Sequence, residues 1–204
     1  TLTTAGGGTV AKSPSASSFL SNAVVTVTAR PEPGWVFLNW TGASTDTSPT
    51  IAVTMDQPKR LRAVFGTTVT ASSIAGKGTV MVIPARGPYP FGALVRVSAI
   101  PSAGFYFGVW DNGLGNVNPL EFEVTSANPT VFGRFIPLAP GQVTLAVNVA
   151  GDGFWRGSPQ KNVFAGGEIA TVAAKGLEGT VLDHWSGDAT GRQNPLPVTL
   201  DQSK

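Results

Sequence analysis

The chain is built around Pro31-Glu-Pro-Gly-Trp-Val-Phe-Leu-Asn-Trp40-Thr-Gly42, a stretch whose pattern returns twice. It reappears as Pro101-Ser-Ala-Gly-Phe-Tyr-Phe-Gly-Val-Trp110 and as Gly176-Leu-Glu-Gly-Thr-Val-Leu-Asp-His-Trp185-Ser-Gly187. In each copy the tryptophan follows a glycine by six residues and an alanine by eleven. Several fixed offsets agree, so the stretch indicates an internal repeat, which is a firmer guide to architecture than chain length.

The shared register extends well beyond this stretch. A proline precedes each tryptophan by 26 residues, and a glycine stands six before each proline: Pro14, Pro84 and Pro159, with Gly8, Gly78 and Gly153. Phe65 and Phe135 each follow their tryptophan by 25 residues, whereas the third counterpart position lies beyond Lys204. We therefore predict repeat modules at 1–66, 67–138 and 139–204, the third without its last strand.

Alternating apolar and polar residues predict strands within each module. Val25, Val27 and Ala29 alternate with threonines, and Leu61, Ala63 and Phe65 alternate with arginines and a valine. This period of two is typical of half-buried antiparallel sheets, and no segment of ten or more residues has helical spacing. The predicted fold is all-β: three tandem small antiparallel modules of about five strands each, arranged as a rod. Each module is β-grasp-like without a clear helix, or a small sandwich, with its repeated tryptophan as the core anchor.

Composition excludes several classes of function. Charged residues make up 13% of the 204, the formal net charge is +2, and lysines and arginines are scattered singly, which disfavours a nucleic-acid partner. There is no cysteine, so stability comes without disulfides, and no apolar run approaches the roughly 20 residues of a membrane helix. Because the sequence begins at Thr1 without a basic or apolar leader, we expect a fragment or a processed chain.

The combined pattern resembles the divergent internalin B-type repeat of bacterial surface and secreted proteins. In the first module the resemblance is carried by glycines, prolines and core residues: Gly6, Gly8, Val10, Pro14, Ala29, Pro31, Gly34, Phe37, Trp40, Gly42, Val53, Thr54, Met55, Asp56, Ala63 and Phe65. The third module departs from it at Gly176 and Leu182, where proline and phenylalanine are expected. The resemblance implies extracellular tandem modules that serve as stalks, spacers or adhesive surfaces, with a β-grasp-like fold that includes a helix, although the sequence itself shows no helical segment.

Residues that could carry chemistry are sparse. His184 is the only histidine, and its counterparts are Asn39 and Val109, so the repeats share no need for an imidazole. A zinc site or a nucleophilic triad lacks supporting ligands or motifs. Glu121 and Glu123 could form an acidic pair, but the other modules do not repeat it. Calcium at Asp183, Asp188 or Asp201 stays open beside ordinary turn capping. We predict no enzyme, no cofactor and no catalytic or metal residues.

Aromatic residues that depart from the repeat pattern are the candidate contacts for a ligand or partner. They are Trp155, Phe154, Trp35 and Tyr106; Trp155 stands where the other modules have Val10 and Val80. Such residues are not required by the shared core. If exposed, they could stack on sugar rings or bind a partner; the alternative is packing at junctions between modules.

These observations predict a non-catalytic extracellular or cell-surface repeat segment that acts as a stalk, spacer or adhesive surface. The alternative is a carbohydrate-binding accessory module of a secreted enzyme. The expected partner is a protein or glycan, not a nucleic acid, and no membrane insertion is expected in this segment. The incomplete third module also predicts strand-mediated association, because it leaves a sheet edge open.

Overall fold

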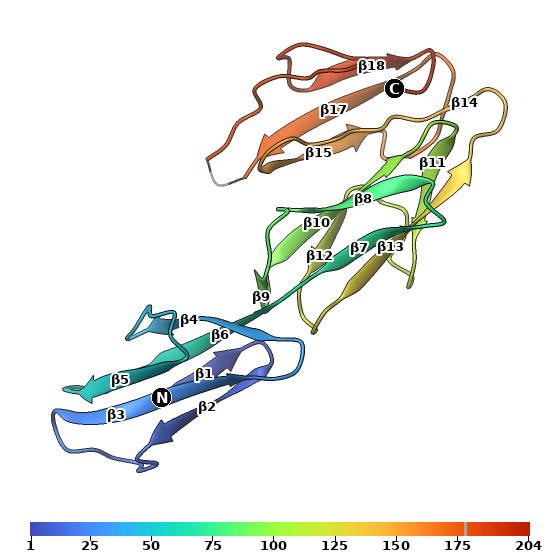
Figure 1. Cartoon of the computed structure of the whole chain (residues 1–204). Helices are drawn as coiled ribbons and strands as arrows, with labels where there is room; N and C mark the ends of the chain where they lie inside the picture. The colour runs from blue at the N-terminus through green and yellow to red at the C-terminus, as the bar shows by residue number, and fades with distance from the viewer. Residues whose placement is uncertain (178) are drawn as a thin grey trace. The chain divides into compact units, whose positions relative to one another are not determined.

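The computed structural model describes residues 1–177 and 179–204, and their regular elements are all strands (Figure 1). The all-β prediction is therefore confirmed. In the described part of the chain, no helix is long and apolar enough to cross a membrane. The residues form two compact units, the first comprising 1–69, 86–94 and 123–129 and the second comprising 70–85, 95–122 and 130–204. The three predicted module boundaries remain predictions.

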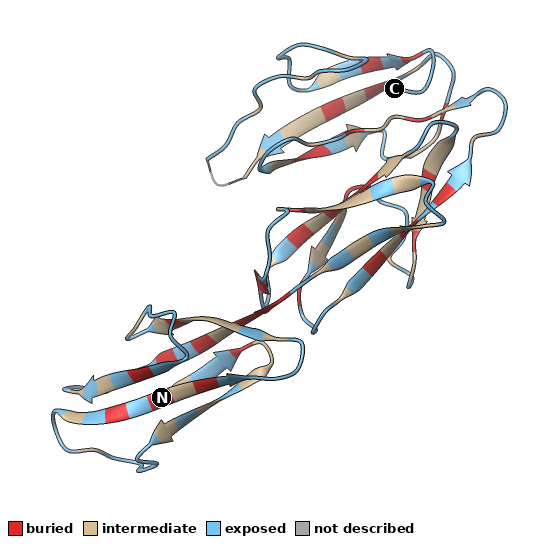
Figure 2. Cartoon of the chain, in the orientation of Figure 1, coloured by how far each residue is buried: buried red, intermediate tan, exposed pale blue. Residues whose placement is uncertain are grey.

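The first repeat lies in the first unit and is a sandwich of two sheets. Its strands are β1 (Leu2–Ala5), β2 (Gly8–Ser13), β3 (Ala23–Pro31), β4 (Val36–Gly42), β5 (Thr50–Met55) and β6 (Leu61–Thr67). One sheet has the order β1-β6-β4 and the other β2-β3-β5. The residues predicted to alternate inward on β3 and β6 meet in one core around Trp40. Figure 2 shows this alternation as buried bands separated by exposed ones along β3.

Two features of the predicted sheet differ from the structure. The repeat has six strands rather than about five, and β1 pairs with β6 in parallel, with Leu2 opposite Leu61 and Ala5 opposite Val64. The predicted antiparallel pairing therefore holds for β2–β3, β3–β5 and β4–β6, and β1–β6 is the exception. Alternation of side chains reports which face of a strand is buried, but it is the same for parallel and antiparallel neighbours.

Two loops from the second repeat's sequence also belong to the first unit. The short strand β9 (Tyr89–Pro90) pairs with the end of β6. The buried Thr67 hydroxyl donates to the Gly34 carbonyl at 2.7 Å, and it accepts the Asn128 backbone N–H at 2.8 Å. These contacts satisfy a polar group that would otherwise be costly to bury.

The body of the second repeat lies in the second unit and has the same two-sheet design. Its strands are β7 (Thr70–Ile74), β8 (Gly78–Ile83), β10 (Leu94–Pro101), β11 (Phe105–Trp110), β12 (Leu120–Glu123) and β13 (Thr130–Pro137). The sheets have the orders β11-β13-β7 and β12-β10-β8, and β7 again runs parallel to β13. Val97, Ala99, Phe107 and Trp110 form its core together with Val131 and Phe135.

The described residues of the third repeat form a three-stranded sheet that corresponds to one of the two sheets of the other repeats. Its strands β15 (Gly153–Ser158), β17 (Glu168–Gly176) and β18 (Leu196–Leu200) pair in the order β15-β17-β18, which matches β2-β3-β5. The short strands β14 (Gln142–Val143) and β16 (Phe164–Ala165) pair with each other. Within the described residues, the segments that correspond to β1 and β4 form no strand and are drawn as coil in Figure 1.

The repeated tryptophans occupy equivalent positions. Trp40 donates its indole N–H to the Ser48 carbonyl at 2.9 Å, Trp110 to Val117 at 2.8 Å, and Trp185 to Gln193 at 2.9 Å. Trp40 and Trp110 are almost wholly buried, as a core anchor should be, whereas Trp185 is only half-buried. Among the described residues, Trp185 is not covered by a counterpart of the sheet β1-β6-β4, and its ring is correspondingly more exposed.

Candidate functional site

The second unit places Trp155 and Phe154 in an interface between sequences of the second and third repeats. Both side chains lie on β15 and both are buried, at 6% and 7% exposure. Neither offers an open ring face for a sugar. The structure favours the packing alternative for these two residues.

Trp155 joins the core of the third repeat and also bonds to the second. It packs in a cluster with Val147, Phe164 and Val172, and its indole N–H donates to the Ser98 hydroxyl at 3.3 Å. Ser98 is 2% exposed and lies on β10, where Val97 and Ala99 point into the second repeat's core. Since side chains alternate along a strand, Ser98 belongs to the opposite face of β10, which β15 covers.

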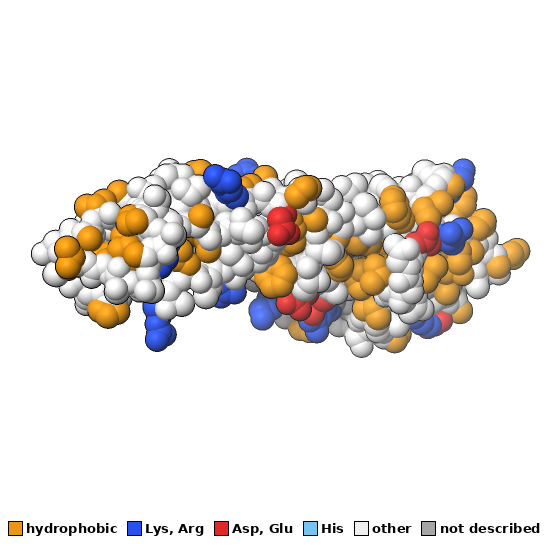
Figure 3. Space-filling model, turned by 90° about the horizontal axis from the view of Figure 1, so that it is seen from below, with side chains coloured by type: hydrophobic (Ala, Val, Ile, Leu, Met, Phe, Trp, Pro, Cys, Tyr) orange, Lys and Arg blue, Asp and Glu red, His pale blue; other side chains and the backbone are white. Residues whose placement is uncertain are grey.

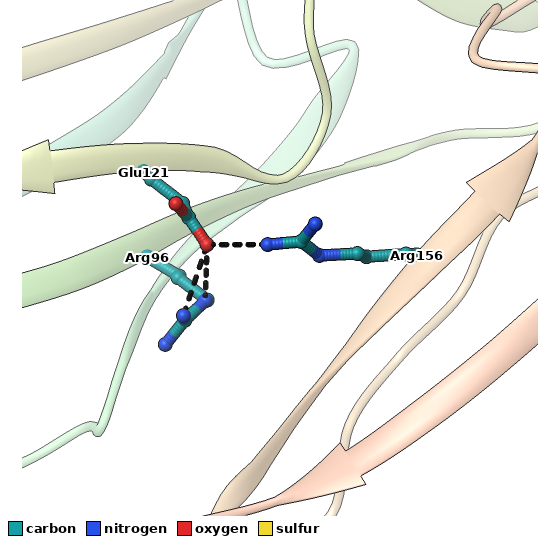
Figure 4. Close-up of polar contacts among 3 residues, drawn as sticks. All are labelled: Arg96, Glu121 and Arg156. Atoms are coloured by element: carbon teal, nitrogen blue, oxygen red, sulfur yellow. Dashed lines mark hydrogen bonds and ion pairs between the residues drawn. The ribbon is translucent and has the colours of Figure 1, made fainter.

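Phe154 lies against two arginines that share one carboxylate. The Arg96 guanidinium carbon lies 3.7 Å from the centre of the Phe154 ring, and that of Arg156 lies 5.8 Å away. Glu121 accepts hydrogen bonds from both arginines at 2.9 Å, as Figure 4 shows. Arg96 comes from β10, Glu121 from β12 and Arg156 from β15. We call these four residues the arginine clamp.

The clamp holds its carboxylate in the charged form. Hydrogen bonding to Arg96, and secondarily to Arg156, lowers the pKa of Glu121 even though partial desolvation opposes the shift. The Glu121 side chain is 42% exposed, so solvent screens the attraction and the ion pairs alone contribute little. The stacked Arg96 guanidinium adds a cation–π contact of about 0.5–2 kcal/mol. The clamp therefore fixes geometry more than it adds stability.

Amide side chains extend this interface. Gln160 donates to the Asn118 carbonyl at 3.2 Å, and Asn162 donates to the Asn116 carbonyl at 2.7 Å. The buried Asn118 side chain in turn bonds both backbone groups of Ala99, at 2.8 and 2.9 Å. The loop before β12 is thus tied inward to β10 and outward to the third repeat.

The other two candidate aromatics lie elsewhere. Trp35 belongs to the first unit, is half-buried, and packs over Gly7, where a Cβ would overlap its indole ring. Its ring centre lies 6.0 Å from that of Phe91, which is 40% exposed. Tyr106 lies on β11 in the second unit and is half-buried. Whether either residue contacts a ligand remains a prediction.

No arrangement typical of catalysis surrounds the remaining candidates. His184 is exposed and its Nδ1 lies 2.9 Å from the Asp183 carboxylate, which Arg192 also approaches. Asp201 pairs with Lys204 at 2.8 Å, as Asp56 pairs with Lys59 at 2.7 Å in the first repeat, which agrees with turn capping. Among the described residues, no group of three or more His, Cys, Asp or Glu is placed to hold a metal. On the face drawn in Figure 3, lysines and arginines are scattered, and some of them lie beside aspartate or glutamate side chains.

Comparison with known families agrees with the repeated sandwich. The family model described as the divergent InlB B-repeat domain matches residues 1–69 and again 67–135. The chain belongs to this family. No curated protein and no solved structure matches it. Repeats of the InlB B family are typical of bacterial surface proteins and are typically non-catalytic.

Sequence reasoning missed the three charged residues of the arginine clamp in this InlB B-repeat chain. Arg96, Glu121 and Arg156 occupy outward-facing strand positions, where charged residues are ordinary. At the same distance from the anchor tryptophan, the other repeats carry different residue types, so a comparison of the repeats does not single these residues out. The departure of Trp155 from the repeat pattern was the one usable signal, and it pointed to the correct strand.

Proposed function

We propose that the chain is a non-catalytic spacer segment of a bacterial cell-surface or secreted protein, whose InlB B repeats hold other parts of that protein at a defined separation. The observation that supports it most is the interface between sequences of the second and third repeats. A spacer requires neighbouring repeats that do not rotate freely, and short flexible linkers alone would allow such rotation.

The interface has the composition that such a role requires. Phe154 and Trp155 remove large apolar surfaces from water, while Ser98 and Asn118 satisfy the buried polar groups beside them. The arginine clamp then orients β15 against β10 and β12. These contacts join core packing with directional bonds, so they favour one relative placement of the two repeats within the second unit.

Distances between spin labels test this proposal. The chain has no cysteine, so labels at Ala103→Cys and Ile169→Cys would report one distance without background. Both positions are exposed and lie in different repeats of the second unit. The proposal predicts one narrow distance distribution, which broadens in Phe154→Ala and stays narrow in Val181→Ala, a change at a residue that is 85% exposed. A broad distribution in the unchanged protein would contradict the spacer role.

Carbohydrate binding is the alternative function, and the Trp35–Phe91 pair in the first unit favours it. The two rings form a partly exposed apolar surface next to the glycine-rich turn at Gly6–Gly7. Glycan-array binding that disappears in Trp35→Ala, while the first unit keeps its melting temperature, would support an accessory module of a secreted enzyme. If the chain binds no glycan on the array, the spacer function is favoured over carbohydrate binding.

A further inference from the structure

The turn between β1 and β2 carries a tryptophan ring that lies flat on two glycines. A Cβ added to Gly7 would overlap Cδ1 and Nε1 at one end of the Trp35 indole, and a Cβ added to Gly6 would lie 3.0 Å from Cζ3 at the other end. Gly7 does not have the left-handed backbone that favours glycine, so its missing side chain serves to make room for the ring. One face of the indole thus rests on the turn, and the part of this half-buried ring that solvent reaches lies away from it.

The second repeat closes this turn in the same way. In the first repeat the backbone N–H of Glu32 donates to the Gly7 carbonyl at 3.2 Å. At the equivalent positions of the second repeat, the backbone N–H of Ser102 donates to the Lys77 carbonyl at 3.0 Å. The two turns therefore share a backbone arrangement, and their side chains can be compared position by position.

In the second repeat an ammonium group of the chain itself lies on the ring. Phe105 stands at the position of Trp35, and the Lys77 Nζ lies 5.2 Å from the centre of the Phe105 ring. An ammonium group at this distance from an aromatic ring makes a cation–π contact. The first repeat has Gly7 in place of the lysine, so its ring lacks this cation.

The first repeat places negative charge beside its ring instead. Glu32 replaces Ser102, and its carboxylate Oε2 lies 3.0 Å from a Cβ added to Gly7, next to the edge of the indole. Within the described residues, no hydrogen bond or ion pair engages this carboxylate. Phe91 extends the aromatic surface: its ring centre lies 6.0 Å from that of Trp35, and it is 40% exposed. Compared with the second repeat, the site has lost a cation and gained an anion.

From these observations we infer that the first unit binds a glycan that carries free amino groups. A protonated sugar amine takes the place that the Lys77 ammonium group has in the second repeat, and the Glu32 carboxylate balances its charge. Trp35 and Phe91 offer a flat surface to the apolar C–H face of the sugar ring. Charge complementarity thus selects an amino sugar over a neutral or acidic one. This inference rests on the carbohydrate-binding alternative and names its class of sugar.

Titration of the whole chain with two matched oligosaccharides tests the inference. A glucosamine oligomer is expected to bind and to shift the indole N–H signal of Trp35 in NMR spectra. The N-acetylated oligomer of the same length has no charged amine and is expected to bind about tenfold or more weakly. Added salt should weaken binding of the glucosamine oligomer, because the paired charges lie at the surface.

The titration separates failure of this inference from failure of the carbohydrate function. Equal binding of the two oligomers would overturn the inference and leave the carbohydrate function standing. No binding of the glucosamine oligomer would also overturn it, and the glycan array would then decide whether any carbohydrate function remains. A lysine-rich peptide that binds as tightly as the glucosamine oligomer would overturn it in favour of a peptide partner.

Charge-matched variants locate the ammonium subsite. Glu32→Gln is expected to remove the preference for the glucosamine oligomer. Asp188→Asn makes the same change of charge at an exposed residue of the second unit and should preserve the preference. Equal effects of the two substitutions would overturn the inference, because net charge rather than this site would then set the preference.

A second pair of variants rebuilds the arrangement of the second repeat. Trp35→Phe supplies the ring that the second repeat carries and is expected to weaken binding of the glucosamine oligomer. Adding Gly7→Lys to it brings the chain's own ammonium group to that ring and is expected to abolish binding. The second repeat folds with this pair of residues, and the melting temperature of the first unit checks that the variant does too; Glu32→Gln remains the test if it does not. Undiminished binding by the folded double variant would overturn the inference.

Discussion

Individual glycines differ between repeats according to what lies opposite them. Gly78 and Gly153 occupy equivalent positions in the same compact unit, yet only Gly78 faces a ring. Gly78→Ala should destabilise the second unit by about 1–3 kcal/mol, since overpacking displaces Phe135. Gly153→Ala should change its stability by less than about 0.5 kcal/mol, because the tight contact with the Lys175 carbonyl offsets the gain from a stiffer unfolded chain. Urea unfolding of both variants checks this, and equal losses would contradict it.

The charge state of Glu121 links the arginine clamp to pH. Its folded pKa is lowered, first by Arg96 and then by Arg156, so its contribution is present above its ordinary pKa of 4.5 and is lost as pH falls through the lower folded value. We expect Glu121 to titrate below pH 4.5 by NMR. Arg96→Gln should raise this pKa more than Arg156→Gln does. The reverse order would show that Arg156 is the principal partner.

At the level of single residues, the sequence singled out Trp155 as a departure from the repeat but did not give its surroundings. Trp155 departs from the repeat pattern, and it does carry a contact that the first repeat lacks. The contact between Trp155 and Ser98 could not be predicted from the sequence. Equivalent positions in the repeats show which residues form the core of a repeat, but they do not show which outer face a neighbouring repeat covers. Trp40 and Trp110 could be predicted as core anchors, because the core residues that bury each tryptophan belong to its own repeat.

At the level of elements, β15 carries the interface within the second unit. Phe154→Ala should destabilise this unit by about 3 kcal/mol or more, because a buried aromatic side chain leaves a cavity. The loss should exceed that of Tyr106→Ala, whose side chain is half-buried. Thermal unfolding of the two variants measures the difference. Similar losses would show that the interface contributes no more than ordinary half-buried packing.

Sequence periodicity predicted the central strands well and their partners less well. The alternation over Val25–Ala29 and Leu61–Phe65 gave β3 and β6 with their buried faces. It could not give the parallel pairing of β1 with β6, which joins residues nearly sixty positions apart in a direction that no local signal encodes.

Adding the sequence of a β6-like strand after Lys204 tests how the third repeat aligns with the first. A chain extended after Lys204 with the sequence of residues 60–67 is expected to unfold at a higher temperature than the 204-residue chain, because Leu145, Val149 and Trp185 become covered. An unchanged melting temperature would mean that the repeat register has been drawn wrongly.

The whole molecule is expected to unfold in two steps, since its residues form two compact units. Trp40→Ala should reduce the free energy of unfolding of the first unit, and Trp110→Ala that of the second, each by the several kcal/mol typical of a buried tryptophan. The melting temperature of the affected unit should fall accordingly. Differential scanning calorimetry should show the other transition nearly unmoved in each case. A single transition that shifts in both variants would contradict the division.

Hydrogen exchange along the chain tests most directly whether the third repeat differs from the first in the ladder that β4 forms. The segment 36–42 in the first repeat pairs with a central strand, whereas its counterpart 181–187 in the third has no ladder in the described structure. We predict slow exchange over 36–42, slow exchange over the paired strand β17, and fast exchange over 181–187. Equally slow exchange over 36–42 and 181–187 would contradict the account, because the third repeat would then be complete.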